Sequence, residues 1–288
     1  MTALKITVVM VTYNRTAIVS EALDCLQNQS YPIETIIVVD NASTDSTKID
    51  LLKRKEKDNR IIILNRASNG GYAAGLETGI VWGQDNLNTD YFWMMDDDSY
   101  PQPTALELLV DGIAKYNYDL LGLTGFKMTI TTKKTILPKE EAETVDYILI
   151  DNALLKKEVA LKVGAPNPDF FMMCEDYEYC IRIKKSGFKI GVLKNNHVNR
   201  LHLGSQKYSR TTLWRGYYHA RNHLLILKNH FSWYLFVHYV IMQFKYLLGS
   251  IFAPDRWLRI KLRLVGIYHG LIEVKGKTLQ PDTLKFTK

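Results

Sequence analysis

The sequence lacks several features that would place it in a specialised class of protein. Among 288 residues there are only three cysteines, Cys25, Cys174 and Cys180, and none forms a C-x-x-C pair. An odd cysteine count without a zinc-binding spacing indicates reduced thiols and a cytoplasmic protein. There is no internal repeat, low-complexity tract or long Gly/Ser linker. The hydrophobic fraction of 47% still allows a sizeable core, enough for one large α/β domain with an appendage.

Long apolar segments are also missing. Residues 5–11 (KITVVMV) form a short, β-branched run, which we expect to be a first strand rather than a signal peptide. Residues 231–244 carry no charge but are shorter than the ~20 residues that a membrane span requires. Basic and aromatic residues follow at 256–264, a mixture typical of a membrane interface. Packing against the rest of the chain, or dimerisation, is the alternative for this region.

Charge and histidine are unevenly distributed. Residues 200–288 contain 15 Lys or Arg and 3 Asp or Glu, whereas residues 1–199 contain 22 and 27. All seven histidines lie at or after His197. A basic last third suggests an anionic partner surface. We therefore divide the chain into a catalytic domain, residues 1–225, and a helical extension, residues 226–288. We expect the extension to bind the inner face of the cell membrane peripherally.

The first 125 residues alternate short apolar runs with amphipathic stretches. Strands are predicted at 6–11, 35–39, 61–64, 91–95 and 120–124, and helices near 17–29, 46–57, 72–82 and 104–116. This alternation predicts right-handed βαβ units and a mostly parallel central sheet. Ligands of such sheets bind beyond the carboxyl ends of the strands, where this sequence places its polar clusters.

An acidic triplet, Asp96, Asp97 and Asp98, follows the apolar strand predicted at 91–95. Adjacent carboxylates repel one another and need a counter-charge when they are desolvated. In an extended segment Asp96 and Asp98 would point to the same side and could hold one Mg²⁺ or Mn²⁺. Such an ion could bridge a diphosphate and neutralise it as a leaving group. The alternative is a solvated acidic turn before Pro101.

Five segments in this order resemble the family 2 glycosyltransferases of the GT-A fold, over about residues 4–225. The segments are 11–15 (VTYNR), 39–45 (VDNASTD), 69–71 (NGG), 96–98 (DDD) and 174–178 (CEDYE). The triplet and the later residues 202–205 (HLGS) look most like bacterial galactofuranosyl- and rhamnosyltransferases, which build cell-wall and surface polysaccharides.

The resemblance implies an inverting, metal-dependent enzyme that moves a sugar from a nucleotide-diphosphate donor to a hydroxyl. The sugar would be galactofuranose, rhamnose or a hexose, and the acceptor a glycan or a lipid-linked molecule. UDP is favoured as the nucleotide over dTDP, because the triplet and a histidine suggest a metal site. Asp176 matches the family's general base, which takes the proton of the acceptor hydroxyl. The alternative is that Glu175 and Asp176 stabilise the start of a helix through its dipole.

The same resemblance assigns the remaining site residues. Those expected to contact the substrates are Thr12, Tyr13, Arg15, Asp40, Asn69, Gly70, Asp96, Asp97, Glu175 and Arg221. Tyr13 would stack on the base and Asp40 would accept a hydrogen bond from it, with helix capping as the alternative for Asp40. Asn69 and Gly70 would allow a close approach of the backbone to the donor, or form a simple turn. The metal ligands would be Asp96, Asp98 and His202.

Three other functions compete with this interpretation. A sugar-1-phosphate nucleotidyltransferase would carry a glycine-rich basic loop after the first strand, which residues 12–15 do not provide. A non-catalytic nucleotide-sugar or membrane-binding module would not need Asp176 and the triplet. Nucleic-acid binding is suggested by the sequence pI near 9.1, but the basic residues are interleaved with apolar ones and suit a lipid surface better.

Overall fold

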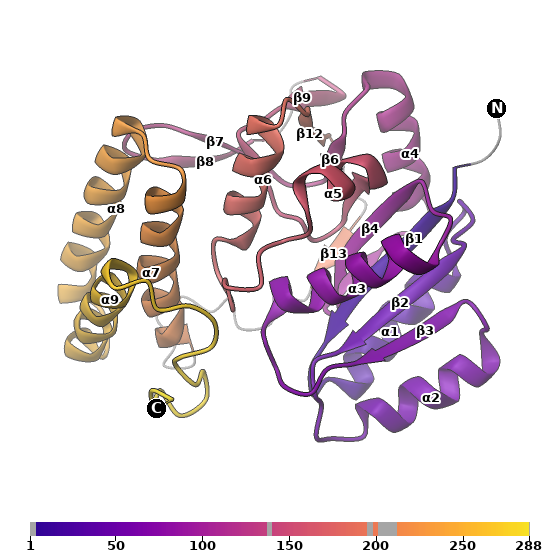
Figure 1. Ribbon diagram of the computed structural model, residues 1–288, viewed down its shortest axis with the longest axis horizontal. Helices are drawn as coiled ribbons and strands as arrows, with labels where there is room; N and C mark the ends of the chain where they lie inside the picture. The colour runs from indigo at the N-terminus through magenta and orange to yellow at the C-terminus, as the bar shows by residue number, and fades with distance from the viewer. Residues whose placement is uncertain (1–3, 137–139, 195–197, 201–211, 288) are drawn as a thin grey trace.

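A computed structural model describes residues 4–136, 140–194, 198–200 and 212–287, and of residues 198–200 it describes the main chain. A central sheet of eight strands crosses most of the molecule (Figure 1). Its order is β3 (Ile61–Asn65), β2 (Thr35–Asp40), β1 (Ile6–Thr12), β4 (Tyr91–Asp96), β11 (Ala153–Lys156), β6 (Leu120–Gly122), β12 (Ile190–Leu193) and β9 (Ala142–Thr144). Residues in β1 and β2 are buried along their whole length, which explains their near-continuous apolar sequences.

The sheet is mostly parallel, as expected from the sequence. Strands β3, β2, β1 and β4 are parallel neighbours, and β12 is parallel to β6. Strand β11 is antiparallel to both β4 and β6, and β9 is antiparallel to β12. The five strands predicted in the first 125 residues are all present, with ends that differ by at most two residues. Their register places Thr12 beside Asp40, so the polar clusters after β1 and β2 share one edge of the sheet.

Helices cover both faces of this sheet. On one face α1 (Thr16–Gln27), α2 (Thr47–Lys57) and α4 (Ala105–Tyr116) contribute to a common apolar cluster with β1 and β4. On the other face α3 (Tyr72–Asn86), α5 (Lys157–Val163) and α6 (Glu175–Lys185) form a second cluster. The doubly covered, mostly parallel sheet confirms the predicted fold class.

Two smaller sheets flank the central one. The first joins β10 (Tyr147–Ile148), β7 (Gly125–Met128) and β8 (Lys133–Ile136) in antiparallel order. The hairpin of β7 and β8 leaves the domain and reaches the C-terminal helices (Figure 1). The second pairs β5 (Ser99–Pro101) with β13 (Val198–Arg200). Of these two sheets, the first links the sheet domain to the C-terminal helices, through the hairpin of β7 and β8.

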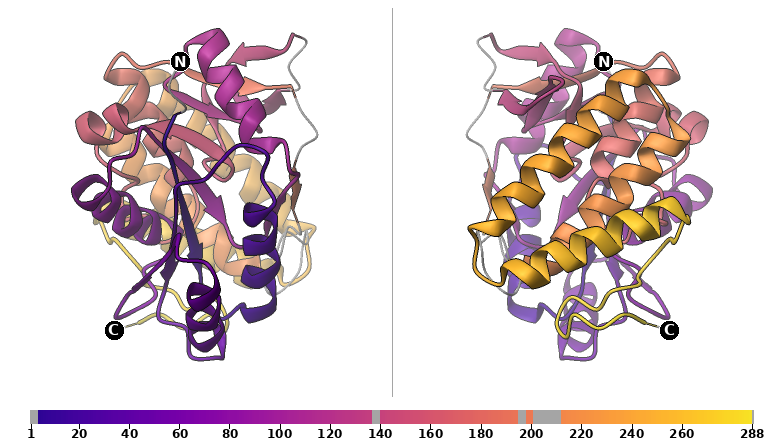
Figure 2. Two further views of the ribbon diagram at one scale, coloured as in Figure 1. Left: turned by 90° about the vertical axis from the view of Figure 1, so that its right-hand side faces the viewer. Right: turned by 90° about the vertical axis from the view of Figure 1, so that its left-hand side faces the viewer.

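The C-terminal part folds into α7 (Leu213–Asn229), α8 (Trp233–Ile251) and α9 (Arg256–Leu271), which form a layer at one end of the molecule (Figure 2, right). Helices α7 and α9 pack closely because Gly266 and Gly270 lie one turn apart on α9. A Cβ at Gly266 would lie 2.4 Å from the carbonyl oxygen of Tyr217. The proposed boundary at residue 225 falls inside α7, and the division into two domains stays a prediction. No helix in the described ranges combines the length and apolarity needed to cross a bilayer.

Candidate active site

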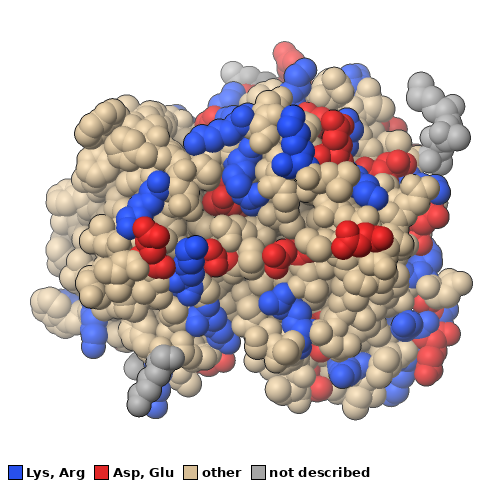
Figure 3. Space-filling view, viewed as in Figure 1, with Lys and Arg blue, Asp and Glu red and all other residues tan. Residues whose placement is uncertain are grey.

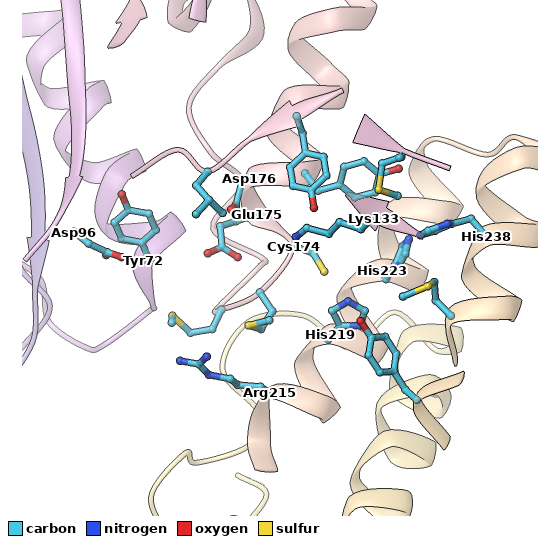
Figure 4. Close-up of a pocket in the computed structure, with 18 residues that line it drawn as sticks. Tyr72, Asp96, Lys133, Cys174, Glu175, Asp176, Arg215, His219, His223 and His238 are labelled. Atoms are coloured by element: carbon cyan, nitrogen blue, oxygen red, sulfur yellow. The ribbon is translucent and has the colours of Figure 1, made fainter. Parts of the chain in front are cut away.

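A cavity of about 310 Å³ lies between the carboxyl end of β4 and the helices α6, α7 and α8 (Figure 4). Three acidic side chains line it, namely Asp96, Glu175 and Asp176. Its wall also contains the basic residues Lys133 and Arg215 and the histidines His219, His223 and His238. The structure thus brings the start of the acidic triplet and the expected general base to one cavity.

The three carboxylates of the triplet lie in different surroundings. Asp96 is the last residue of β4 and lines the cavity. Asp97 is 2% exposed and accepts hydrogen bonds from Thr12 Oγ1 at 2.7 Å and from Arg15 Nη1 at 2.6 Å. Asp98 is also buried, with Oδ2 3.8 Å from Arg15 Nη1. Burial raises the pKa of Asp97, and the positive charge of Arg15 opposes that effect.

The expectation of an extended segment through Asp98 is wrong. Strand β4 ends at Asp96, residues 97 and 98 form a tight turn, and β5 begins at Ser99. The alternation of side chains along a strand therefore does not place Asp96 and Asp98 on one side. Burial of Asp97 and Asp98 also excludes the alternative of a solvated acidic turn.

Asp151, which no sequence pattern indicated, fixes the main chain of the triplet. Its Oδ1 accepts a hydrogen bond from the backbone N–H of Asp96 at 2.8 Å, and its Oδ2 accepts one from Ser99 Oγ at 2.6 Å. Asp151 precedes β11, the strand that pairs with β4, so the pairing of these strands brings it to the triplet. A single aspartate in a loop gives no sequence signal for this role.

The general-base candidate stands at the start of α6. Asp176 is the second residue of this helix and lines the cavity beside Glu175, the first. Met173 and Cys174, which precede the helix, both have positive φ values, of 73° and 70°. Such strained backbone is stable only where its surroundings fix it. Asn222 of α7 does so, because its Nδ2 donates to the carbonyl oxygens of Met172 at 2.9 Å and Met173 at 2.8 Å.

The acidic first turn of α6 also includes Glu178, but this residue has a structural role. Glu178 is 2% exposed and its Oε1 accepts a hydrogen bond from Arg182 Nε at 2.8 Å.

Lys133, a residue of β8, lies within electrostatic range of Asp176. Burial lowers the pKa of Lys133, and the charge of Asp176 works against this change. The Lys133 Nζ also lies over the rings of Phe126, at 4.0 Å, and Tyr147, at 4.8 Å.

The polar residues after β1 and β2 form a connected edge beside the triplet. Tyr13 is exposed and available for stacking. Asn14 joins the two loops, because its backbone N–H donates to Ser43 Oγ at 2.9 Å and its Oδ1 accepts from the Thr44 N–H at 2.7 Å. Asp40 is buried, and its Oδ1 accepts from the backbone N–H of Ser43 at 3.0 Å. Asp40 therefore orders its own loop, and its contact with a base stays a prediction.

The glycines after Asn69 are explained by contacts within the protein. Asn69 Oδ1 accepts from the backbone N–H of Gly71 at 3.0 Å, which forms a tight turn. Gly71 has a φ of 88°, and a Cβ there would lie 1.7 Å from the carbonyl oxygen of Phe171. A Cβ at Gly70 would meet Ala74 and Arg66, each at 2.9 Å. The close approach here is to the segment that leads into α6, and contact of Asn69 and Gly70 with the donor stays a prediction.

Arg221 lies away from the cavity. It is fully buried, and its Nη1 donates to the carbonyl oxygen of Gly276 at 2.7 Å and to Thr278 Oγ1 at 3.0 Å. It therefore holds the C-terminal tail against α7 instead of facing a substrate, because protein groups already take up its hydrogen bonds. His202 lies outside the described residues, so its expected role as a metal ligand stays a prediction.

The histidines of the cavity were also missed. His219 and His223 are four residues apart on α7 and line the cavity together with His238 of α8. Their spacing places them on one face of a helix, which was the available signal. Within the described part of the chain, no group of three His, Cys, Asp or Glu side chains converges as a metal site. Any cation at the acidic triplet would need further ligands from the substrate, from water or from undescribed residues.

Comparison with known proteins agrees with this geometry. The profile of the family described as Glycosyl transferase family 2 matches residues 7–177, more than half of the chain. The chain is 29% identical over 116 residues to Glycosyltransferase GlyA of Streptococcus pneumoniae serotype 4. That match covers 40% of this chain and 16% of the relative, so the chain spans only a small part of the curated protein.

Two solved structures share the fold. One is the mannosyltransferase PcManGT from Pyrobaculum calidifontis in complex with GDP-Man and Mn²⁺, with a TM-score of 0.60, 15% identity and coverage of 93% of this chain and 75% of that one. The other is GalNAc-T7 with UDP, GalNAc and Mn²⁺, with a TM-score of 0.64, 13% identity and coverage of 95% and 57%. With its matching profile and this architecture, the chain belongs to glycosyl transferase family 2 and has the GT-A fold.

Proposed function

We propose that this protein is an inverting, metal-dependent glycosyltransferase that uses a nucleotide-diphosphate sugar. The observation that carries the proposal is the shared cavity of Asp96 and Asp176. Asp96 lies at the carboxyl end of β4, where sheets of this type bind ligands. Asp176 lies on a different element, the start of α6. The cavity between them offers one side for a donor and another for an acceptor.

Asp176 acts as the general base in this proposal. An acceptor hydroxyl is a poor nucleophile at neutral pH, and a carboxylate within hydrogen-bond reach accepts its proton as the new bond forms. The acceptor oxygen bonds to the anomeric carbon while the bond from that carbon to the diphosphate oxygen breaks. The electron pair leaves with the nucleoside diphosphate, and attack from the opposite face inverts the anomeric carbon. No covalent intermediate is needed.

The triplet fits a hard divalent cation in its donor chemistry. Asp96 presents a carboxylate to the cavity, Asp98 is the second candidate ligand, and His202 is a third from outside the described residues. When bound, Mn²⁺ or Mg²⁺ would neutralise charge on the departing diphosphate. Thr12 and Arg15 hold Asp97 in place, so the turn that carries these ligands is anchored to β1 and to the residue that precedes α1. Both structural neighbours were solved with Mn²⁺.

We propose UDP as the first nucleotide to test and dTDP as the second, with galactofuranose, rhamnose or a hexose as the sugar. The neighbours hold GDP-Man and UDP, so a GDP-sugar belongs in the same test. The acceptor would be a hydroxyl of a glycan or a lipid-linked molecule in cell-surface polysaccharide synthesis. The cavity supports a hydroxyl acceptor because it contains the carboxylate of Asp176 and, beyond it, the imidazole rings of three histidines, which can hydrogen-bond to hydroxyl groups (Figure 4).

We also propose that α8 and α9 dock on an anionic lipid surface. Along α8, an apolar stripe at helical spacing is exposed and comprises Trp233, Val237, Val240, Phe244, Leu248 and Ile251. Phe252 and Trp257 continue it and are 84% and 74% exposed. The end of the molecule formed by these helices shows few charged side chains in Figure 3. Lys245, Arg256 and Lys261 are also exposed, and their charge complements an anionic surface.

A donor screen tests the proposed activity. The full chain would be incubated with UDP-, dTDP- and GDP-sugars and Mn²⁺, and release of the nucleoside diphosphate would be measured. We expect release from at least one donor, loss of that release in excess EDTA, and recovery when Mn²⁺ or Mg²⁺ is added back. Full activity in excess EDTA would reject the metal, and no release from any donor would reject the transferase itself. Formation of pyrophosphate from a nucleoside triphosphate and a sugar phosphate would instead identify a nucleotidyltransferase.

A further inference from the structure

The cavity continues past Asp176 into a chamber walled by the C-terminal helices. We call this part the histidine chamber and define it by Lys133, His219, His223 and His238 (Figure 4). Asp96 lies at one side of the cavity, Asp176 and Glu175 near its middle, and the histidine chamber at the other side (Figure 4). If the donor lies at Asp96, the histidine chamber is on the side from which an acceptor would reach the base.

His223 carries the inference. It is 5% exposed, and neither of its ring nitrogens has a hydrogen-bond partner within the described residues. Its ring packs edge-on against Tyr177 at 5.8 Å and Tyr239 at 5.4 Å between centroids. Buried polar atoms without partners cost free energy and are rare in native proteins. His223 is held in place by aromatic neighbours while its ring nitrogens lack hydrogen-bond partners. It is therefore suited to form hydrogen bonds with a ligand.

The neighbouring histidines extend the same pattern. His219 Nδ1 is also without a partner among described groups, and its ring centroid lies 5.7 Å from that of His223. His238 is tied to the protein on one side, because its Nδ1 donates to the carbonyl oxygens of Thr129 at 2.9 Å and Ile130 at 3.1 Å. That contact fixes the tip of the hairpin formed by β7 and β8. The hairpin in turn carries Lys133 into the cavity.

We propose that the histidine chamber binds the uncharged, polyhydroxylated part of the acceptor, with His219 and His223 hydrogen-bonding to its hydroxyl groups. This inference rests on the proposed glycosyl transfer, because it assigns the acceptor side of that reaction. It makes the C-terminal helices part of acceptor selection, since α7 and α8 supply all three histidines.

The chemistry of the wall favours a neutral ligand. Burial lowers the pKa of His223 to about 3 and that of His219 well below its usual range, so both rings are uncharged at neutral pH. An uncharged imidazole has one donor and one acceptor nitrogen, which complement neighbouring hydroxyls that both donate and accept. The cavity wall carries three carboxylates, Asp96, Glu175 and Asp176, against two cations, Lys133 and Arg215, so it has no net positive charge to attract an anion. Tyr147, Tyr177 and Tyr246 add aromatic faces, which suit the apolar face of a sugar ring.

Binding can be tested without any knowledge of the donor. The full chain with ¹³C-labelled histidine would be titrated with galactose and ribitol, and separately with galactose 6-phosphate and ribitol 5-phosphate. The histidine ring C–H signals report contact, and His219→Phe and His223→Phe assign them. We expect saturable shifts at His219 and His223 with at least one neutral probe, and weaker shifts with its phosphate ester. Tighter binding of the phosphate esters, or no shift with any neutral probe, would overturn the inference.

Kinetics with the donor found in the screen give a second test. We expect His223→Phe to raise the KM for the acceptor probe about 5- to 20-fold, as for the loss of one or two hydrogen bonds. The KM for the donor should rise less than the KM for the acceptor, because the donor is proposed to lie at the Asp96 side of the cavity. His223→Gln should recover part of the loss, because it restores a donor and an acceptor. His230→Phe is the matched control, since His230 lies at the end of α7 and does not line the cavity.

The outcomes separate this inference from the proposed function. A wild-type protein that hydrolyses no donor would fail the proposed function, and the titration would still decide whether the histidine chamber binds polyols. A wild-type protein that is active, with an unchanged acceptor KM in His223→Phe, would overturn the inference alone. Thermal unfolding of each variant is measured first. If His223→Phe does not fold, His219→Phe replaces it and is expected to raise the same KM.

Discussion

Asp151 accepts a hydrogen bond from the backbone N–H of Asp96 at 2.8 Å, and this contact fixes the residue with which β4 enters the cavity. The same carboxylate accepts a second hydrogen bond from Ser99 Oγ at 2.6 Å, on the far side of the turn formed by Asp97 and Asp98. One side chain from the loop before β11 therefore holds both ends of the acidic turn. The geometry of the triplet depends on a residue that is distant from it in sequence.

We expect Asp151→Ala to weaken the affinity of the enzyme for its metal ion. The substitution leaves the backbone N–H of Asp96 without this acceptor, which should cost about 1–3 kcal/mol of unfolding free energy. Loss of such a supporting contact should also raise the Mn²⁺ concentration for half-maximal activity about 10- to 100-fold. Asp151→Asn keeps an acceptor and should lie between the variant and wild type. Identical Mn²⁺ titrations for the three proteins would contradict this role.

We expect Asp176→Asn to reduce transfer by ~100-fold or more while leaving donor binding intact, because an amide cannot accept the proton of the acceptor hydroxyl. Steady-state rates and calorimetric titration with the donor would measure the two effects. Glu178→Gln is the matched control from the same turn of α6, because Glu178 is bonded to Arg182 and does not line the cavity. Near-normal turnover of Asp176→Asn would remove Asp176 as the base.

Two glycines with nearly the same positive φ should respond differently to alanine. Gly71 has a φ of 88° and a Cβ position 1.7 Å from the Phe171 carbonyl oxygen, whereas Gly187 has a φ of 86° with no atom within 4 Å. Gly187→Ala should cost about 1 kcal/mol for the left-handed backbone alone. Gly71→Ala should cost more than about 3 kcal/mol, because the segment before α6 must also move. Urea unfolding of both variants measures the difference, and equal losses would contradict the packing argument.

Removing exposed aromatic side chains on and between α8 and α9 should weaken binding to lipid without unfolding the protein. We expect Trp233→Ser, Phe252→Ser and Trp257→Ser together to weaken binding to phosphatidylglycerol vesicles at least about 10-fold, because each loses apolar area that would enter the interface. Cosedimentation measures this. Ile49→Ser with Leu161→Ser is the control, since these exposed apolar residues lie on α2 and α5. Unaltered binding of the triple variant would exclude this surface.

Acidification should destabilise the protein through its buried histidines. In the unfolded chain a histidine binds a proton below about pH 6.5, whereas burial holds the pKa of native His223 at about 3. The unfolded state therefore binds more protons between these pH values, and stability falls as the pH falls. His223 alone should lower the unfolding free energy by about 2 kcal/mol between pH 7.5 and pH 5.

The test of this prediction is urea unfolding at the two pH values. His223→Phe removes the titrating group, so its loss on acidification should be about 2 kcal/mol smaller than that of wild type. His219 lies beside His223 and should add to the effect, because burial also lowers its pKa. Equal losses in wild type and His223→Phe would show that the ring becomes protonated in the native state.

The sequence by itself determined the fold class and the positions of the first strands along the chain. Periodic apolar runs place β1, β2, β3 and β4 within two residues, because burial on both faces requires such runs. It also identified Asp96, because it follows an apolar strand, and Asp176, because it matches the general base of the family that the sequence resembles. It did not predict the turn at Asp97 and Asp98, because a local pattern does not show which carboxylate a distant arginine will bind.

Only the tertiary structure decided which side chains share the cavity. Strand pairing brings Asp151 to the backbone of Asp96, whereas a protruding hairpin and helix packing bring Lys133 and His223 to the cavity. Arg221 shows the converse, because its charge suggested a substrate contact while packing of α7 against the C-terminal tail buried it. Sequence patterns record which face of an element is apolar, and long-range packing decides what each polar side chain meets.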